Sequence, residues 1–403
     1  MRVLSGMRPT GLLHIGHWEG VLKNWVELQK SGAECFFFSA DWHMLTTEYE
    51  NIHEVTPIVR ENVADWIACG VDPSKSVIFV QSRIKETAEL FLLLSMITGV
   101  SMLENNPTYK EQLAELNRSR VSPPLLQKAL KELKGRKVDG TQCEALETDL
   151  KKLSEGEFVR ELDVTHRILD RAKPLLSEET WQRIYEASVP KDIKTAGFLL
   201  YPVLQTADII LYKANEVPVG QDQLPHVEIS REITRKFNAL YPGKGGKPVF
   251  PEPVAKLTPV PKLLGLDGRK MSKSYGNAVM LSDSADEVTA KLKPMKTDEK
   301  RQRLTDPGEP NDCNVYSWHE LYSSRDECAT VAANCRGARW GCMDCKMLLA
   351  GNLNRTLEPV RQKRKALLDN PAVIEKIIAD GSEKAADVAR STLKEVREVM
   401  KIG

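Results

Sequence analysis

Two histidines near the start of the chain have a spacing that suits binding of a phosphorylated ligand. His14 and His17 are three residues apart, after a turn shaped by Pro9 and Gly11, where the pattern indicates that a helix begins. Side chains three apart share a helix face, and a helix N-terminus carries partial positive charge that favours phosphate. Gly16 leaves room for a flat ring against the backbone. Alone, the motif is equally typical of two surface histidines at a helix cap.

Two lysines much later in the chain suit a mobile clamp on a triphosphate. Lys270 and Lys273 are three residues apart in a segment, 268–274, that also carries a glycine and small hydroxyl residues. A lysine ammonium is a compact charge on a flexible stem, so it can follow a phosphate as a loop closes. A solvated basic loop is the commoner origin of such a run. The lysine pair and the histidine pair together are much more specific than either alone.

Five of the eight cysteines fall between Cys313 and Cys345. Cys342 and Cys345 form a CxxC pair, which is a common metal-chelating spacing. Twenty-one residues separate Cys313 from Cys335, and six separate Cys335 from Cys342. Four thiolates suit a tetrahedral zinc ion or an iron–sulfur cluster, and spacing does not distinguish the two. Cys328 is a competing ligand, and reduced structural cysteines are the simplest alternative, since disulfides are not expected in such a chain.

The composition is that of an ordinary globular enzyme. The 403 residues are 41% hydrophobic and 28% charged, with a mean hydropathy of −0.35, which excludes a largely disordered or fibrous chain. The length predicts more than one domain. No apolar run reaches the ~18 residues of a membrane span, and the first residues lack the apolar stretch of a signal peptide, so we expect a cytoplasmic protein with no membrane association. The net charge is +1, so the chain as a whole does not attract polyanions, and any such binding depends on local basic faces.

The first 100 residues alternate short apolar runs with helical patterns, which predicts a parallel sheet with right-handed crossover helices. Strands are expected at 3–5, 35–38, 77–80 and 217–219, and helices at 17–29, 54–69, 86–97, 195–212 and 221–241. Ligands on such a sheet bind beyond the carboxyl ends of the strands, and the histidine pair follows the first strand. Residues 242–261 are rich in proline, glycine and lysine and predict a loop.

The pattern between 117 and 190 is different, because it is polar and helical, lacks β-branched runs and begins with a group of basic residues. We interpret this stretch as a helical insertion. From residue 283 the pattern is helical to the end. The predicted fold class is therefore α/β, with a Rossmann-like parallel-sheet catalytic domain at 1–116 and 191–280, a helical insertion at 117–190 and an all-α C-terminal domain at 281–403.

With both motifs, the chain resembles the class I aminoacyl-tRNA synthetases, whose HIGH and KMSKS signatures match residues 14–17 and 270–274 in full consensus. Residues 4–11, 40–43, 201–208 and 217–223 are similar to segments of the bacterial tryptophanyl-tRNA synthetases, and the resemblance covers nearly the whole chain except the insertion. It implies a homodimeric ligase that activates L-tryptophan with ATP and Mg²⁺ and transfers it to tRNA(Trp). The domain at 281–403 is then expected to bind the anticodon end of the tRNA. Its basic run 363–365 is usual for a solvated helix face and is here also a candidate for phosphate contact.

The resemblance also implies roles for individual residues. The implied catalytic group is His14, His17, Lys270 and Lys273. The implied ATP-binding set is Arg8, Pro9, Thr10, Gly16, His17, Gly220, Gln221, Asp222, Lys270, Met271, Ser272, Lys273 and Ser274. The implied tryptophan-binding set is Leu4, His43, Tyr201, Gln205, Asp208 and Gln223. Asp208 lies in a mostly apolar helix, where a buried carboxylate needs a donor such as an indole N–H, although without the family a structural hydrogen bond is the simpler interpretation.

Tyrosyl-tRNA synthetases share the fold and both motifs and are the alternative. They usually carry a tyrosine where this chain has Leu4, and an aspartate where it has Arg8. An aliphatic Leu4 leaves a wide apolar slot that suits an indole ring. Because a site that hydrogen-bonds its substrate discriminates strongly, these two positions favour tryptophan.

A subset of the bacterial tryptophanyl enzymes has a similar C-terminal set of four cysteines that binds a [4Fe–4S] cluster. The resemblance implies such a cluster at Cys313, Cys335, Cys342 and Cys345, with Zn²⁺ as the alternative. The first spacing is one residue shorter than the family pattern, which puts Cys313 in question.

Overall fold

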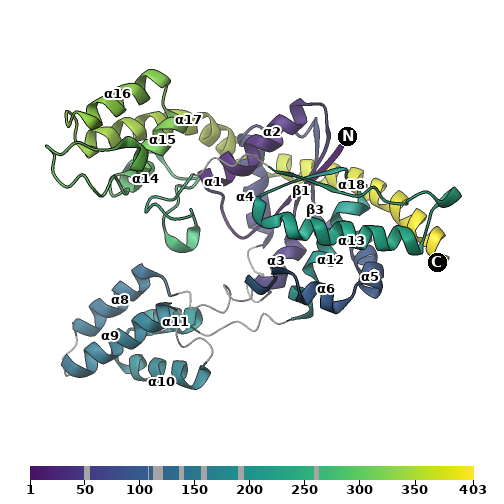
Figure 1. Ribbon diagram of the computed structural model, residues 1–403, viewed down its shortest axis with the longest axis horizontal. Helices are drawn as coiled ribbons and strands as arrows, with labels where there is room; N and C mark the ends of the chain where they lie inside the picture. Colours follow the sequence, from purple (N-terminus) through teal and green to yellow (C-terminus); the bar gives the residue numbers. More distant parts are fainter. Residues whose placement is uncertain are drawn as a thin grey trace. The chain divides into compact units, whose positions relative to one another are not determined.

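The structure, a computed structural model, describes residues 1–49, 55–107, 109–111, 121–135, 140–155, 161–188, 195–257 and 263–403 (Figure 1). The chain divides into two compact units. The first joins Met1–Thr98, Leu200–Lys273 and Asn277–Gly403, and the second joins Gly99–Leu199 and Ser274–Gly276. The division into four segments made from the sequence stays a prediction.

The first unit is built on a five-stranded sheet in the order β3-β2-β1-β4-β5, and all of its strand pairs are parallel. The strands are β1 (Arg2–Met7), β2 (Glu34–Ser39), β3 (Ser76–Val80), β4 (Glu216–Val219) and β5 (Val254–Leu257). The strand order reverses between β1 and β4, and open parallel sheets bind ligands at this switch point, beyond the carboxyl ends of the strands. The residues that follow these two strands therefore face a site.

Aromatic side chains join the sheet to helices on both of its faces. On one face, Trp25 of α2 (Lys23–Lys30) stacks on Phe37 with ring centroids 4.3 Å apart, and Trp66 of α4 (Val55–Ala68) meets Trp25 edge-on at 5.0 Å. On the other face, Phe36 packs against Tyr212, which follows α12 (Ala196–Leu211). Successive strand residues point to opposite faces, so a short, wholly apolar run is what a sheet buried on both faces requires.

The remaining helices of the sheet region follow the predicted alternation. They are α1 (Ile15–His17), α3 (Asp41–Glu48), α5 (Lys85–Ile97) and α13 (Leu224–Leu240), with the 3-10 turns η3 (Gln81–Arg83), η5 (Gln221–Gln223), η6 (Lys244–Gly246) and η7 (Lys273–Tyr275). The parallel sheet and its helices confirm the predicted α/β fold class.

Three elements differ from the prediction. Helix α3, which follows β2, lies where no helix was predicted. The predicted helix 17–29 is interrupted by a π-helix, η1 (Trp18–Leu22), which separates α1 from α2. The predicted loop 242–261 contains β5, the edge strand, whose Val254 and Leu257 are exposed. An edge strand with little buried surface needs no continuous apolar run, and the prolines and glycines before it obscured the strand.

The residues after 277 form helices, of which α17 (Cys342–Leu368) and α18 (Pro371–Met400) pack on the sheet region. The others are α14 (Ala285–Leu292), α15 (Asn314–Tyr322) and α16 (Arg325–Arg336), with the turn η8 (Pro310–Asp312). Helix α17 packs against α4, and α18 lies on β3. At Gly381 of α18 a Cβ atom would be 1.9 Å from the carbonyl oxygen of Ile78, so only glycine permits this approach.

The second unit is a bundle of short helices with a separate apolar core (Figure 1). It contains α6 (Val100–Glu104), α8 (Pro123–Lys134), α9 (Gly140–Glu155), α10 (Leu162–Ala172), the turn η4 (Lys173–Leu175) and α11 (Glu178–Ser188). Leu133, Leu150, Leu169 and Ile184 are each almost completely buried in it. In the described ranges, none of the helices combines the length and the apolar character needed to cross a bilayer.

Candidate active site

The histidine pair lies at the start of α1, beyond the carboxyl end of β1. The backbone N–H of His14 donates to Nδ1 of His17 at 3.2 Å, and the two rings are 3.8 Å apart. A Cβ on Gly16 would lie 2.9 Å from the ring of His14 and 3.4 Å from the sulfur of Met271. The flat ring that Gly16 accommodates is therefore the imidazole of His14.

Burial keeps both imidazoles neutral. Burial, together with the positive charge of Lys273, lowers the pKa of His14 to about 4, and burial together with His14 and Lys273 lowers that of His17 to about 3. At neutral pH the pair therefore acts through hydrogen bonds rather than through cationic charge. Nδ1 of His14 is buried and has no hydrogen-bond partner among the described residues, which leaves this atom to bond a ligand.

The lysine motif closes onto the same backbone as the histidine motif. Nζ of Lys273 donates to the carbonyl oxygen of Thr10 at 3.2 Å. It also lies beside Gly11, whose φ is +125° and where a Cβ would be 2.9 Å from Nζ. Lys270 is exposed in the same loop, and Met271 is buried. The structure thus brings together two motifs that are far apart in the sequence.

Asn277 holds the shape of the lysine loop and was not predicted from the sequence. Its amide oxygen accepts the backbone N–H of Ser272 at 2.8 Å. Its amide nitrogen donates to Oδ1 of Asp267 at 2.7 Å and to the carbonyl oxygen of Lys270 at 3.1 Å. One buried side chain therefore fixes three points of the loop. A single asparagine after a glycine is a usual turn sequence, so nothing in its type marked it.

The segment after the lysine loop pairs with the histidine motif. His14 and Met280 form an antiparallel bridge. The N–H of Ile15 donates to the carbonyl of Val279 at 3.0 Å, and the N–H of Leu281 donates to the carbonyl of Leu13 at 2.9 Å. Backbone hydrogen bonds thus set the position of one motif relative to the other.

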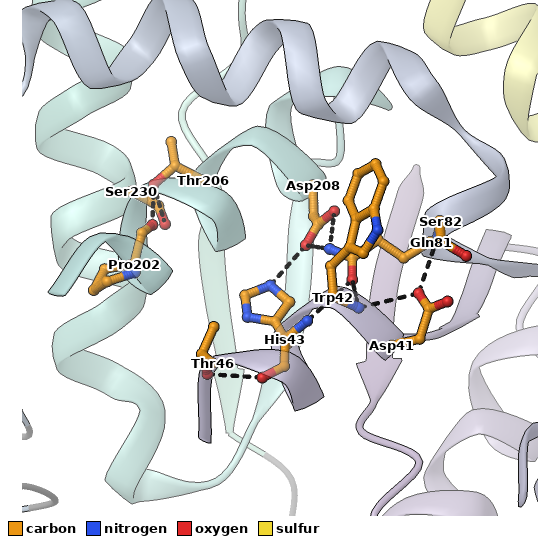
Figure 2. Close-up of polar contacts among 10 residues, drawn as sticks. All are labelled: Asp41, Trp42, His43, Thr46, Gln81, Ser82, Pro202, Thr206, Asp208 and Ser230. Atoms are coloured by element: carbon orange, nitrogen blue, oxygen red, sulfur yellow. Dashed lines mark hydrogen bonds and ion pairs between the residues drawn. The ribbon is translucent and has the colours of Figure 1, made fainter. Parts of the chain in front are cut away.

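A buried carboxylate lies beside residues that follow the carboxyl ends of β2 and β3. Asp208 of α12 is 2% exposed, and its two oxygens accept Nε2 of Gln81 at 2.9 and 2.8 Å. Nε2 of His43 donates to Oδ2 at 2.9 Å (Figure 2). Burial raises the pKa of Asp208, and the hydrogen bond from His43 opposes that shift. A buried carboxylate held by two donors retains lone pairs for a third, such as an indole N–H.

Gln81 was missed by the sequence analysis, although a signal for it existed. It directly follows the carboxyl end of β3, where ligand-binding residues of parallel sheets lie. Its Oε1 also accepts the backbone N–H of Trp42 at 3.1 Å, so it joins α3 to α12 (Figure 2).

A second chain of hydrogen bonds runs beside Asp208. The hydroxyl of Tyr201 is hydrogen-bonded to Nε2 of His226, and Nδ1 of His226 is 3.0 Å from Oε1 of Gln223. Because an amide oxygen only accepts, Nδ1 carries the proton and Nε2 accepts from Tyr201. His226 is fully buried and was not predicted. A lone histidine in a helix carries no spacing signal.

The other predicted residues lie around this region. Leu4 is buried in β1, and Gln205 is half-buried on α12, between Tyr201 and Asp208 at helical spacing. Arg8 donates to the hydroxyl of Thr47 in α3. The turn after β4 contains Gly220 and Gln221, Pro9 is buried, and the side chains of Asp222 and Ser274 lie outside the described ones.

The four cysteines lie on consecutive helical elements in the C-terminal region. Cys313 precedes α15, Cys335 is in α16, and Cys342 and Cys345 are in the first turn of α17. Burial, together with the nearby Cys313, Cys335 and Cys342, raises the pKa of Cys345 to about 12, so these four sulfurs lie within electrostatic range of one another. Cys328 instead donates to the carbonyl of His319 at 3.3 Å.

Two polar side chains lie close to these sulfurs. Nη1 of Arg301 is 3.9 Å from the sulfur of Cys335, and Nε2 of His319 is 3.4 Å from that of Cys345. Four sulfur donors beside a guanidinium and a helix N-terminus fit an iron–sulfur cluster chemically. Within the part of the chain that the structure describes, no group of three or more histidine, cysteine or acidic side chains is placed to hold a metal ion.

Comparison with known proteins covers the whole chain. Residues 1–130 and 169–358 match the family model described as tRNA synthetases class I (W and Y). The tryptophan--tRNA ligase of Aquifex aeolicus is 46% identical over 407 residues, with all of both chains covered. That of Thermotoga maritima is 43% identical over 403 residues, which span all of this chain and 99% of the other.

Solved structures agree with these relatives. The tryptophanyl-tRNA synthetase of Campylobacter jejuni, complexed with ADP and tryptophan, has a TM-score of 0.74 and 26% identity, with all of both chains covered. A tyrosyl-tRNA synthetase of Archaeoglobus fulgidus is 18% identical over 90% of each chain, with a TM-score of 0.52, which shows a common fold alone. The chain therefore belongs to the class I tRNA synthetases of the tryptophan and tyrosine group, and within that group to the tryptophan--tRNA ligases.

Proposed function

We propose that this tryptophan--tRNA ligase forms tryptophanyl-adenylate between its two signature motifs, with His14, His17, Lys270 and Lys273 as the groups that bind the phosphates. The contact of Lys273 with Thr10 carries the proposal, because it joins the two motifs at one point. The overall reaction joins L-tryptophan to tRNA(Trp) at the expense of ATP, which is the activity of the family.

The first step requires positioning and charge stabilisation rather than a protein nucleophile. The carboxylate of tryptophan attacks the α-phosphorus of ATP, and pyrophosphate leaves with the electrons of the broken P–O bond. Charge develops on the phosphate oxygens, where preorganised donors are most effective. Lys273 and Lys270 supply positive charge to the leaving pyrophosphate, and the substrate's own Mg²⁺ shares it. Nδ1 of His14 is the buried atom positioned to bond a phosphate or ribose oxygen.

The remaining ATP contacts are assigned to the loops at the switch point. We place adenosine against the turn formed by Gly220, Gln221 and Asp222, because this turn follows β4 at the carboxyl edge of the sheet. Gly16 contributes to the ATP site by making room for the imidazole of His14. The entrance is formed by Arg8, Pro9 and Thr10, and the rest of the lysine loop by Met271, Ser272 and Ser274. In the second step, a hydroxyl of the terminal adenosine of the tRNA attacks the tryptophanyl carbonyl and AMP leaves.

We assign Asp208 as the acceptor of the indole N–H. Its hydrogen bonds with Gln81 and His43 fix both oxygens, so the carboxylate does not have to reorganise when tryptophan enters. Tyr201 and Gln205 share the helix face of Asp208, Gln223 lies next to His226, and Leu4 provides an apolar wall. Tyrosine carries an O–H donor at the end of its ring instead of an N–H at the side of a bicyclic ring, so we expect its donor to lie at a different place from the indole N–H.

The function is tested by exchange of labelled pyrophosphate into ATP. We expect exchange with tryptophan and none with tyrosine or without an amino acid, because the first step is reversible only when the cognate adenylate forms. Exchange with tyrosine alone would contradict the assignment.

We also propose that Cys313, Cys335, Cys342 and Cys345 bind a [4Fe–4S] cluster, which would brace the helices that contact the tRNA. Four thiolates within electrostatic range, with Arg301 beside them, support it. Anaerobically purified protein is expected to contain iron and sulfide, with a broad absorption near ~400 nm. Cys342→Ser should lose the iron, and the control Cys328→Ser should retain it. Iron-free protein with one zinc ion per chain would contradict the cluster.

Two further features support the remaining parts of the proposal. The family model leaves residues 131–168 unmatched, which supports a helical insertion there. Leu92 and Met96, four residues apart on α5, are 53% and 72% exposed, and an apolar helix face of this kind supports a homodimer. The C-terminal helices are proposed to bind the anticodon end, and the cytoplasm is where tRNA is charged.

A further inference from the structure

Two arginines on α17 do not face solvent, although their sequence context is that of a basic surface. Arg361 and Arg364 are one turn apart, and the side chain of each is 14% exposed. Nε of Arg364 donates to Oδ1 of Asp65 in α4 at 2.6 Å, and its Nη2 bonds to Glu61. Nε of Arg361 donates to the carbonyl oxygen of Asp283 at 2.8 Å. Arg364 is therefore occupied within the protein and is not a contact for tRNA phosphate.

Asp65 connects Arg364 to the histidine motif. Its side chain is 1% exposed, and its carboxylate lies close to the backbone N–H of Leu13. Leu13 directly precedes His14, and its carbonyl oxygen accepts the N–H of Leu281. This residue of the motif thus lies between Asp65 on one side and the segment after the lysine loop, which bonds its carbonyl oxygen, on the other.

Arg361 acts on the opposite strand of the same bridge. Asp283, whose carbonyl it binds, uses its own carboxylate to accept the N–H of Met280 at 2.8 Å and Nζ of Lys291 at 2.6 Å. Met280 is the bridge partner of His14. Both arginines of α17 therefore end on the short bridge where the two signature motifs meet.

We propose that Asp65 and Arg364 are positioning residues for adenylate formation, which hold the Leu13 peptide and through it the imidazole of His14. The proposal deepens the assignment of His14 and rests on it. A buried ion pair contributes little net stability compared with apolar packing. The presence of this pair is therefore better explained by the backbone geometry that it fixes. Burial raises the pKa of Asp65 to about 6 and the charge of Arg364 opposes that shift, so at neutral pH the carboxylate is ionised and presents only acceptors to Arg364 and to the Leu13 peptide. Through this pair, α17 positions the catalytic backbone.

The test compares kcat with KM in tryptophan-dependent pyrophosphate exchange. Asp65→Asn and Arg364→Met are each expected to lower kcat about 100-fold, because a displacement of about 1 Å at a reacting group has an effect of this size. The KM for tryptophan should change less than about twofold in both variants. The indole site does not touch this pair. Arg364→Lys, which keeps the charge, should recover part of the lost kcat.

Arg60→Met is the matched control. Arg60 is also on α4 and pairs with Glu375 of α18 at 3.0 Å, but has no bond to either motif. It should lower the thermal midpoint while kcat remains unchanged. An equal loss of kcat in this control would overturn the proposal, and so would Asp65→Asn and Arg364→Met proteins with lower midpoints and normal kcat. If Asp65→Asn does not fold, Arg361→Met tests the other strand of the bridge with the same readout. Loss of tryptophan-dependent exchange in the unaltered protein would instead contradict the proposed function.

Discussion

Lys273→Ala is expected to lower the kcat of tryptophan-dependent pyrophosphate exchange by about 100- to 1000-fold. Removal of one preorganised donor to developing negative charge costs about 3–4 kcal/mol of transition-state stabilisation. Lys273 meets this description, because its ammonium is already placed over Thr10 and Gly11, and burial lowers its pKa and strips its hydration. The pyrophosphate would then leave without this compensating charge.

Tryptophan binding should be unchanged in this variant, because the indole site of Asp208 involves none of the lysine loop. Equilibrium binding of tryptophan by calorimetry checks this. Lys244→Ala is a suitable control, since Lys244 is an exposed lysine in η6, away from both motifs in sequence. A Lys273→Ala protein with normal turnover would overturn the role of the motif.

Asp208→Ala is expected to lower kcat/KM for tryptophan by about 1000-fold and to leave the KM for ATP nearly unchanged. A site built to bond a substrate N–H discriminates strongly by this group, and the loss also leaves the donors of Gln81 and His43 buried without an acceptor. The variant should also discriminate less between tryptophan and 1-methyltryptophan, which lacks the indole N–H. Exchange kinetics with both amino acids measure this ratio.

Thr206→Val is the control on the same helix. The hydroxyl of Thr206 is bonded to Ser230 at 3.0 Å, on the side of α12 away from Asp208 (Figure 2). This change should cost about 1 kcal/mol of folding stability and leave the choice between the two amino acids intact. If Asp208→Ala kept the preference of the unaltered protein for tryptophan over 1-methyltryptophan, another group would have to be the indole acceptor.

The sequence predicts those parts of the fold that repeat a physical pattern. The run from Cys35 to Phe38 is buried on both faces, so every residue is apolar and the strand is evident. The edge strand β5 buries little and has no such pattern. A π-helix has the same composition as the α-helices around it, so the interruption at residues 18–22 leaves no periodic signal.

The residues of the candidate site likewise fall into those that the sequence predicts and those that it does not. His14 and Lys273 were found because they belong to motifs with fixed spacing. Gln81, His226 and Asn277 each act through one hydrogen-bonded side chain, whose partner is distant in the sequence. The need for a donor to the buried Asp208 was predictable from the sequence. The identity of that donor was not, because it depends on which strand ends beside α12 in the folded chain.

In the basic run 363–365, helical periodicity indicates that Arg364 faces the protein rather than solvent. Leu357 and Val360 are buried on α17, and Arg364 follows them by seven and four residues, which places it on the same face. Lys363 and Lys365 are off this face. The heptad spacing was therefore visible in the sequence, although the pairing with Asp65 was not.

The contact of Gly381 with Ile78 has a consequence for synthesis of the chain. Helix α18 follows every other element in sequence, yet it covers β3, which is among the first to leave the ribosome. Until α18 emerges, the nascent sheet has an apolar surface without its natural cover, and such surfaces invite aggregation. Slow translation of the intervening segment should therefore reduce the yield of folded enzyme, and the molecules that do complete folding should each be fully active.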